Sequence, residues 1–191
     1  MKRLGIYVHI PFCAKKCNYC DFYSLASGED EKKAYIEALK REIREVSKNV
    51  NDEYRVYTIY FGGGTPSIIK AEYIKEILDE IRLHFKLYED DFFPEITIEC
   101  NPKTVDMEKL LVYKEAGINR ISLGLQSTDD DELRLLGRIH TYEDFLYSYD
   151  MVRKSGFTNV NIDLMSAIPK QKITTYEKSL DELIRLNPEH I

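Results

Sequence analysis

The sequence has few cysteines and no long apolar run. Four cysteines among 191 residues are too few for a disulfide scaffold, and the three between positions 13 and 20 could form only mutually exclusive short disulfide loops. A reducing compartment and a metal or cluster site explain this crowding better. The apolar stretch at residues 4–10 is interrupted by His9 and stopped by Pro11, so it is too short for a signal-peptide core or a membrane span. We therefore expect a cytoplasmic protein without a membrane span.

An excess of basic residues is also missing. The chain has 27 Lys and Arg against 33 Asp and Glu, a net charge of -6 and a pI near 5.4. Proteins that bind nucleic acid gain affinity by releasing counterions through clustered Lys and Arg. The sequence therefore predicts no nucleic-acid partner. Its 43% hydrophobic and 31% charged residues fit one folded domain over residues 1–191.

Strand-like runs alternate with helical apolar stripes along the chain. Strands are expected over residues 4–10, 56–61, 96–100, 120–125 and 160–165, and helices over 31–46, 73–85, 107–116, 130–153 and 176–186. Gly117 and Gly156 stand where helix C-caps are expected. This alternation predicts an α/β fold with a parallel sheet and right-handed crossovers. Residues 187–191 resemble the start of a sixth strand, as in a truncated barrel.

Most of the unusual residues lie at the ends of the predicted strands. They are the three clustered cysteines, the glycines at 62–64, and residues 99–102, 124–127 and 163. Both barrels and open α/β sheets bind ligands at the carboxyl edge of their strands. The functional site is therefore expected at this edge.

The first strand is followed by a CxxxCxxC pattern at Cys13, Cys17 and Cys20. Thiolates hold iron-sulfur clusters, and three thiolates leave one iron of a four-iron cluster open to bind a ligand. A structural zinc site is one alternative, but it would need a fourth ligand such as His9 or Cys100. Three incidental buried thiols are another. Cys100, at a strand end, is expected to be a small buried apolar residue.

The second strand ends in the run Gly62-Gly63-Gly64-Thr65-Pro66. It lacks the Gly-Lys-Ser/Thr of a P-loop and the spacing of a dinucleotide-binding turn. Three glycines allow backbone groups to approach a small ligand closely, and carbonyls there could accept from an amino group. The alternative is a tight turn in which Thr65 and Pro66 begin the next helix.

Six motifs, in order, give the chain a specific resemblance. They are YVHIPFCAKKCNYCDF at 7–22, GGGTP at 62–66, IECNP at 98–102, RISLGLQS at 120–127, LGRIH at 136–140 and NIDL at 161–164. Together they resemble the oxygen-independent coproporphyrinogen oxidase family of radical-SAM proteins. The resemblance implies a partial radical-SAM (β/α) barrel with a [4Fe-4S] cluster on the three cysteines. The open iron of such a cluster binds S-adenosylmethionine, whose reductive cleavage yields a 5'-deoxyadenosyl radical.

The resemblance also implies which residues surround the S-adenosylmethionine. They are Tyr7, Tyr19, Gly63, Gly64, Thr65, Glu99, Gln126, Arg138 and Asp163. Glu99 and Asp163 would bind hydroxyl or amino groups, although solvated loop acids would look the same in sequence. Arg138 would meet a carboxylate, or else be a helix-surface charge. Gln126 could merely end its strand. The two tyrosines could pack around the cysteine loop, with Tyr19 offering its face to the adenine.

Within this family the sequence favours the haem-chaperone branch, of HemW type, over the oxidase. The resembling oxidase has a longer segment before its cluster and a further cysteine at the position of Phe22, and the segment 137–140 looks like the chaperone. Thr128 and the stretch 165–170 depart from the family pattern. The expected partners are haem or a porphyrin and an electron donor such as flavodoxin or ferredoxin. The haem-binding motif of the chaperones would lie beyond residue 191.

Overall fold

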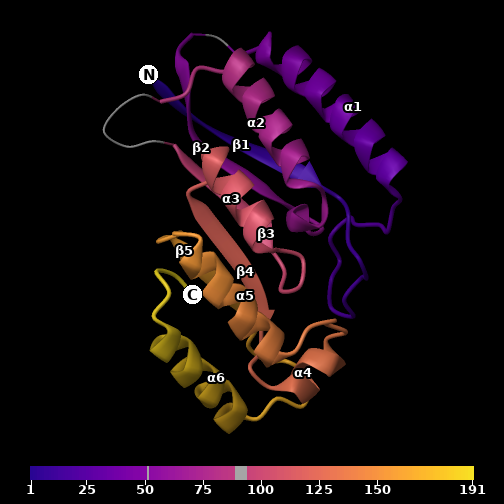
Figure 1. Cartoon of the computed structure of the whole chain (residues 1–191), viewed down its shortest axis with the longest axis vertical. Coiled ribbons are helices and arrows are strands. Elements are labelled where there is room, and N and C mark those ends of the chain that lie inside the picture. The colour runs from indigo at the N-terminus through magenta and orange to yellow at the C-terminus, as the bar shows by residue number, and fades with distance from the viewer. Residues whose placement is uncertain (51, 89–93) are drawn as a thin grey trace.

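Five parallel strands form one sheet in the order β1-β2-β3-β4-β5, in a computed structural model that describes residues 1–50, 52–88 and 94–191 (Figure 1). The strands are β1 (Lys2–Ile10), β2 (Tyr54–Gly63), β3 (Glu95–Cys100), β4 (Arg120–Gln126) and β5 (Val160–Leu164). The helices are α1 (Glu29–Ser47), α2 (Ala71–His84), α3 (Met107–Glu115), α4 (Asp130–Leu135), α5 (Tyr142–Lys154) and α6 (Ile173–Leu186), with a short 3-10 helix, η1 (Pro66–Ile68), after β2.

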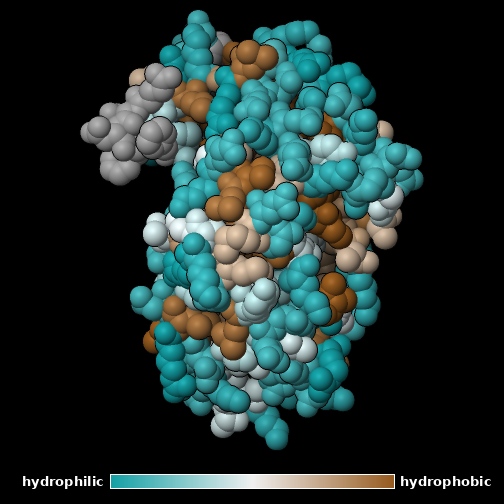
Figure 2. All heavy atoms as spheres, in the orientation of Figure 1, coloured by the Kyte–Doolittle hydropathy of each residue, from teal (hydrophilic) through white to brown (hydrophobic). Residues whose placement is uncertain are grey.

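The helices cover one face of the sheet (Figure 1). The strand side chains on that face are buried and apolar, for example Phe61, Ile98 and Ile121 at matching positions in three adjacent strands. The other face carries polar side chains such as Glu99 and Asp163. The period-two alternation along each strand thus separates a core face from a polar inner face, as in an open barrel wall. Seen from the helix side, the surface is mostly hydrophilic, with small hydrophobic areas (Figure 2).

The predicted fold class is confirmed, and each predicted strand is present within about two residues of its expected ends. Gly117 and Gly156 directly follow the C-caps of α3 and α5 with φ of +89° and +88°, which confirms their predicted role. Beyond α6, Ile162 N donates to His190 O over 3.1 Å, and His190 N to Val160 O over 3.3 Å. The last residues therefore begin to pair with β5 in parallel. In the described part of the chain, no helix has the length and hydropathy needed to cross a membrane.

The single helical region predicted over residues 130–153 is wrong. Two helices occupy it, and Gly137 separates them because its φ of +76° is incompatible with a continuing helix. The next helix, α5, starts at a capping box between Thr141 and Asp144. The segment 136–141 is thus a loop, and it carries Arg138 to the carboxyl edge of the strands.

Candidate functional site

A pocket of about 350 Å³ lies at the carboxyl edge of the sheet, where the site was expected. It gathers all of the proposed site residues except Tyr7: Cys13, Cys17, Tyr19, Cys20, Gly63, Gly64, Thr65, Glu99, Gln126, Arg138 and Asp163. Ligand pockets in proteins have volumes of about 300–1,000 Å³, so a small ligand could fit here. The pocket is formed by the ends of β2 to β5, the cysteine loop and the 136–141 loop.

The cysteine loop is a turn held to the sheet at its base. Cys20 N donates to Cys17 O over 3.2 Å, and Cys13 N donates to Leu25 O over 3.1 Å. The three thiols are each partly exposed and line the same pocket, so the alternative of three buried thiols is wrong. Among the described residues, no three His, Cys, Asp or Glu side chains are grouped closely enough to hold a single metal ion. Thiolates are the ligands that hold iron-sulfur clusters, and three of them lie around this one pocket.

The glycine run joins β2 to the start of the cysteine loop. Gly64 N donates to Ile10 O over 2.9 Å, and Thr65 N donates to Phe12 O over 2.8 Å. A Cβ on Gly64 would lie 2.7 Å from Phe12 O, and Gly63 has a φ of +114° with the His9 ring against it. The glycines are therefore required by contact between the two loops, whether or not a ligand is bound. Thr65 and Pro66 do start the next helix, because Thr65 is the N-cap of the 3-10 helix η1 and Pro66 its first residue; the α-helix α2 begins later, at Ala71.

The 136–141 loop packs on the cysteine loop through Asn18. Asn18 N donates to Leu136 O and Asn18 Nδ2 to Leu135 O, both over 2.9 Å. A Cβ on Gly137 would lie 2.9 Å from Asn18 Oδ1, so the glycine permits this close packing as well as the positive φ. Asn18 thus connects two segments that are far apart in sequence. The sequence interpretation did not single it out, although it lies inside the cysteine motif.

Arg138 reaches the centre of the pocket and is not a helix-surface charge. Its Nη2 donates to Asn101 Oδ1 over 2.5 Å and to Gly124 O over 2.7 Å. Its Nη1 makes longer contacts, 3.7 Å to Cys17 Sγ and 3.5 Å to Tyr19 Oη. The Nη1 edge is therefore the part of the guanidinium most open to a further acceptor. Asn101 was not predicted as a site residue, because its role depends on Arg138 coming from another loop.

A small cavity lies behind Arg138. It measures about 30 Å³ and is lined by residues that include Cys17, Thr65, Asn101, Arg138 and His140. His140 is 4% exposed, and its Nε2 donates to Leu125 O over 3.2 Å. Burial lowers the pKa of His140 to about 4, so the ring is neutral. Neither His140 Nδ1 nor Arg138 Nε has a hydrogen-bond partner among the described residues. The volume suits about one water molecule, which could accept from one nitrogen and donate to the other.

Two carboxylates face the pocket from adjoining parts of the sheet. Glu99 accepts a hydrogen bond from Tyr60 Oη over 2.7 Å, and Asp163 accepts from Asn161 Nδ2 over 2.7 Å and from Ser122 Oγ over 3.3 Å. Burial raises the pKa of both carboxyls above the ordinary range. They are therefore not the solvated loop acids of the alternative interpretation. Half-buried acids with unused lone pairs can bind hydroxyl or amino groups of a ligand.

Gln126 ends β4 in a strained conformation. Its φ is +78°, and the pairing of β4 with β5 shifts between Gly124 and Gln126. A non-glycine residue in this region costs about 1–3 kcal/mol and persists only where the surrounding structure holds it. Gln126 O accepts from Met165 N over 2.9 Å, which holds the strained backbone in place. Gln126 does end its strand, but with a side chain that lines the pocket.

The two tyrosines differ in position. Tyr19 is 40% exposed, lines the pocket and accepts a hydrogen bond from Arg138. Tyr7 is 58% exposed, stacks on Tyr60 with ring centroids 6.1 Å apart and donates to His9 Nδ1 over 3.2 Å. Tyr7 thus lies beside the pocket on the inner face of the sheet. Its predicted contact with a cofactor is the one that this geometry supports least.

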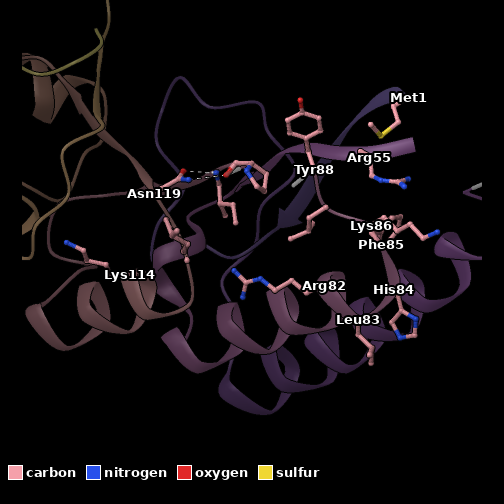
Figure 3. Close-up of a pocket in the computed structure, with 15 residues that line it drawn as sticks. Met1, Arg55, Arg82, Leu83, His84, Phe85, Lys86, Tyr88, Lys114 and Asn119 are labelled. Carbon is pink, nitrogen blue, oxygen red and sulfur yellow. Dashed lines mark hydrogen bonds between the residues drawn. The ribbon is translucent and has the colours of Figure 1, made fainter. Parts of the chain in front are cut away.

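Cys100 and a second, larger cavity have no role in the predicted chemistry. Cys100 borders the pocket but is 2% exposed, which confirms the prediction of a small buried residue, and burial raises its pKa to about 12. A second cavity, about 1350 Å³ and larger than the pocket, is at the opposite, amino edge of the strands (Figure 3). Its Arg82 and Lys114 donate to Ala116 O and Gly156 O at the ends of α3 and α5. These cations therefore stabilise helix termini.

Comparison with known proteins decides the family. The family model described as "Radical SAM superfamily" matches residues 7–183 of this chain. The chain belongs to the radical SAM superfamily. This agrees with the [4Fe-4S] cluster and S-adenosylmethionine that the sequence predicts as cofactors. The five parallel strands and outer helices are thus part of a radical SAM barrel.

Similar proteins within this superfamily act on haem or porphyrin according to their names. The chain is 40% identical to the heme chaperone HemW of Haemophilus influenzae, covering 98% of this chain and 49% of the relative. It is 33% identical to the oxygen-independent coproporphyrinogen III oxidase of Pseudomonas aeruginosa, covering 98% and 41%. The solved structure of coproporphyrinogen III oxidase (HemN) from Escherichia coli superimposes with a TM-score of 0.85 at 31% identity, covering 97% and 42%. The chain spans about half the length of the curated heme chaperones that it matches.

Proposed function

We propose that this chain is the radical SAM core of a HemW-type haem chaperone, with a [4Fe-4S] cluster on Cys13, Cys17 and Cys20. The observation that carries the proposal is that three partly exposed thiols share one pocket with Arg138 and two half-buried carboxylates. When bound, such a cluster supplies an electron that cleaves the sulfonium of S-adenosylmethionine. The protein residues would bind and orient that molecule.

The pocket offers a partner for each polar part of S-adenosylmethionine. The Nη1 edge of Arg138 would bind the carboxylate, and backbone carbonyls of Gly63 and Gly64 would accept from the amino group. Glu99 and Asp163 would bind hydroxyls of the ribose, for which their buried oxygens are suited. Thr65 and Gln126 would complete the walls. The face of Tyr19 would cover the adenine, with Tyr7 supporting the inner face from beside the pocket.

The haem-chaperone assignment rests on two features. Phe22 stands where the oxidase carries a further cysteine, and it is 69% exposed at the pocket mouth. His140, within the chaperone-like segment 137–140, is buried and holds the loop that positions Arg138. The heme chaperones among the relatives are also more similar to this chain than the oxidase is. An oxygen-independent coproporphyrinogen III oxidase remains the second candidate, because its fold and motifs are shared.

A haem or porphyrin partner and an external electron donor, such as flavodoxin or ferredoxin, belong to the same proposal. Lys15 and Lys16 lie within the cysteine loop, between Cys13 and Cys17, and line the pocket, where they could face an acidic electron donor. The test is anaerobic reconstitution of the full-length protein, followed by iron, sulfide and zinc analysis. We expect about four irons and four sulfides per chain, without stoichiometric zinc. Stoichiometric zinc alone would refute the cluster.

The two candidate functions are separated by their substrates. With the cluster loaded, the chaperone should bind haem stoichiometrically with a shifted Soret band. It should not convert coproporphyrinogen III to protoporphyrinogen IX under anaerobic reducing conditions. Steady conversion would favour the oxidase and leave the cluster assignment intact. Failure to bind S-adenosylmethionine would count against both.

A further inference from the structure

The side-chain amide of Asn101 forms hydrogen bonds at both of its ends. Its Oδ1 accepts from Arg138 Nη2 over 2.5 Å, and its Nδ2 donates to Thr65 Oγ1 over 2.8 Å. Its backbone N–H lies 3.3 Å from the hydroxyls of both Ser67 and Thr104, which hold the residue in place. Since the arginine can only donate, the amide oxygen must face it, and the NH₂ group must face the threonine.

This arrangement decides where the hydroxyl hydrogen of Thr65 points. Thr65 is 5% exposed and already accepts from Asn101, so its one hydrogen is available for its other polar neighbour. That neighbour among the described residues is Cys13 Sγ, 3.5 Å away. A thiolate can only accept. The donors therefore run in one direction, from the Arg138 guanidinium through an amide and a hydroxyl to the sulfur.

The same guanidinium also approaches a second cysteine directly. Arg138 Nη1 lies 3.7 Å from Cys17 Sγ. Hydrogen bonds to the sulfurs and nearby positive charge are among the factors that set the reduction potential of an iron-sulfur cluster. They stabilise the more negative, reduced state, and hydrogen bonds in a chain polarise and strengthen one another. Removing a donor should therefore make the cluster harder to reduce.

We propose that Asn101 and Thr65 form a hydrogen-bond relay from Arg138 to Cys13 that raises the reduction potential of the cluster. The inference rests on the proposed cluster and assigns to Asn101 a positioning role. Arg138 then serves two purposes, since it would bind S-adenosylmethionine through one edge and tune the cluster through its contacts with the two cysteines.

The test is the midpoint potential of the reconstituted full-length protein without S-adenosylmethionine, from a redox titration followed by the EPR signal of the reduced cluster. Thr65→Val keeps the side-chain shape and removes the donor, so the potential should shift to more negative values. Thr65→Ser keeps the hydroxyl and should stay near wild type. Asn101→Ala removes the donor to Thr65 Oγ1, so the Thr65 hydroxyl is no longer oriented toward Cys13 or polarised by the amide. The potential should therefore fall in this variant as well. Thr128→Val, which removes a hydroxyl bonded to Ser179 away from the cysteines, should leave it unchanged.

Iron and sulfide content is measured in each variant, so that a changed potential is not confused with lost cluster. Wild-type potentials in both Thr65→Val and Asn101→Ala at full cluster content would overturn the relay and leave the proposed function standing. Failure of the wild type to take up a cluster would overturn the proposed function and the relay together. If Thr65→Val does not load, Asn101→Ala decides the question by the same measurement, one bond further from the sulfur.

Discussion

Replacing Gly64 with alanine should destabilise the protein by about 2–6 kcal/mol, because the added Cβ meets backbone on the opposite loop. The Cβ would lie 2.7 Å from Phe12 O, 2.9 Å from Phe12 N and 3.0 Å from Ile10 O. Backbone atoms cannot rotate away as a flexible side chain can. Overpacking of this kind costs about 1–3 kcal/mol.

The rest of the expected loss comes from hydrogen bonds between the two loops. Moving the loops apart weakens two backbone hydrogen bonds, from Gly64 N to Ile10 O and from Thr65 N to Phe12 O. Each of these bonds contributes about 0.5–1.5 kcal/mol to stability. For a chain of this size, each kcal/mol corresponds to about 2–4 °C in Tm. Thermal and urea unfolding of the variant and the wild type would measure the difference. Cluster uptake should fall as well, since Phe12 directly precedes the first cysteine.

Gly28 offers a matched control. It precedes α1 with a φ of -77°, and an added Cβ would meet no atom within 4 Å. Gly28→Ala should therefore change stability by no more than about 1 kcal/mol. If Gly64→Ala were as stable as Gly28→Ala, the close packing of the glycine run against the cysteine loop would not exist in solution, and the reasoning would fail.

Two further predictions concern the pocket. Changing Cys13, Cys17 or Cys20 to alanine should abolish the absorbance of the cluster after anaerobic reconstitution, whereas Cys100→Ala should retain it; an equal loss in Cys100→Ala would refute a three-cysteine site. Burial raises the folded-state pKa of Glu99. Between the ordinary pKa and this raised pKa, the native state therefore binds more protons than the unfolded chain. The free energy of unfolding falls as the pH rises through that window. Glu99→Gln should therefore be more stable than wild type at neutral pH and lose this advantage below the ordinary carboxyl pKa. Urea midpoints measured across the acidic range would check this, and a constant difference at all pH values would contradict it.

The strands and most helices could be predicted because each depends on local pattern. Residues 96–100 read as a strand from their apolar content and became β3, and Gly117 and Gly156 marked helix ends that need a positive φ. The error at residues 130–153 has the same origin. The apolar stripe of α5 resembles a continuation of α4, although Gly137 and the capping box of Thr141 and Asp144 are helix-end and helix-start signals of the same local kind.

By itself, the sequence determined the class of fold, the three-cysteine motif and the edge of the sheet at which the site lies. These follow from periodicity and spacing, which are properties of neighbouring residues. Only the tertiary structure decided that Arg138 leaves the helix and enters the pocket, that Asn101 joins it to Thr65, and that Asn18 holds the two loops together. Each of these contacts joins segments more than 30 residues apart. Their formation depends on how the loops pack in space, and no local pattern records it.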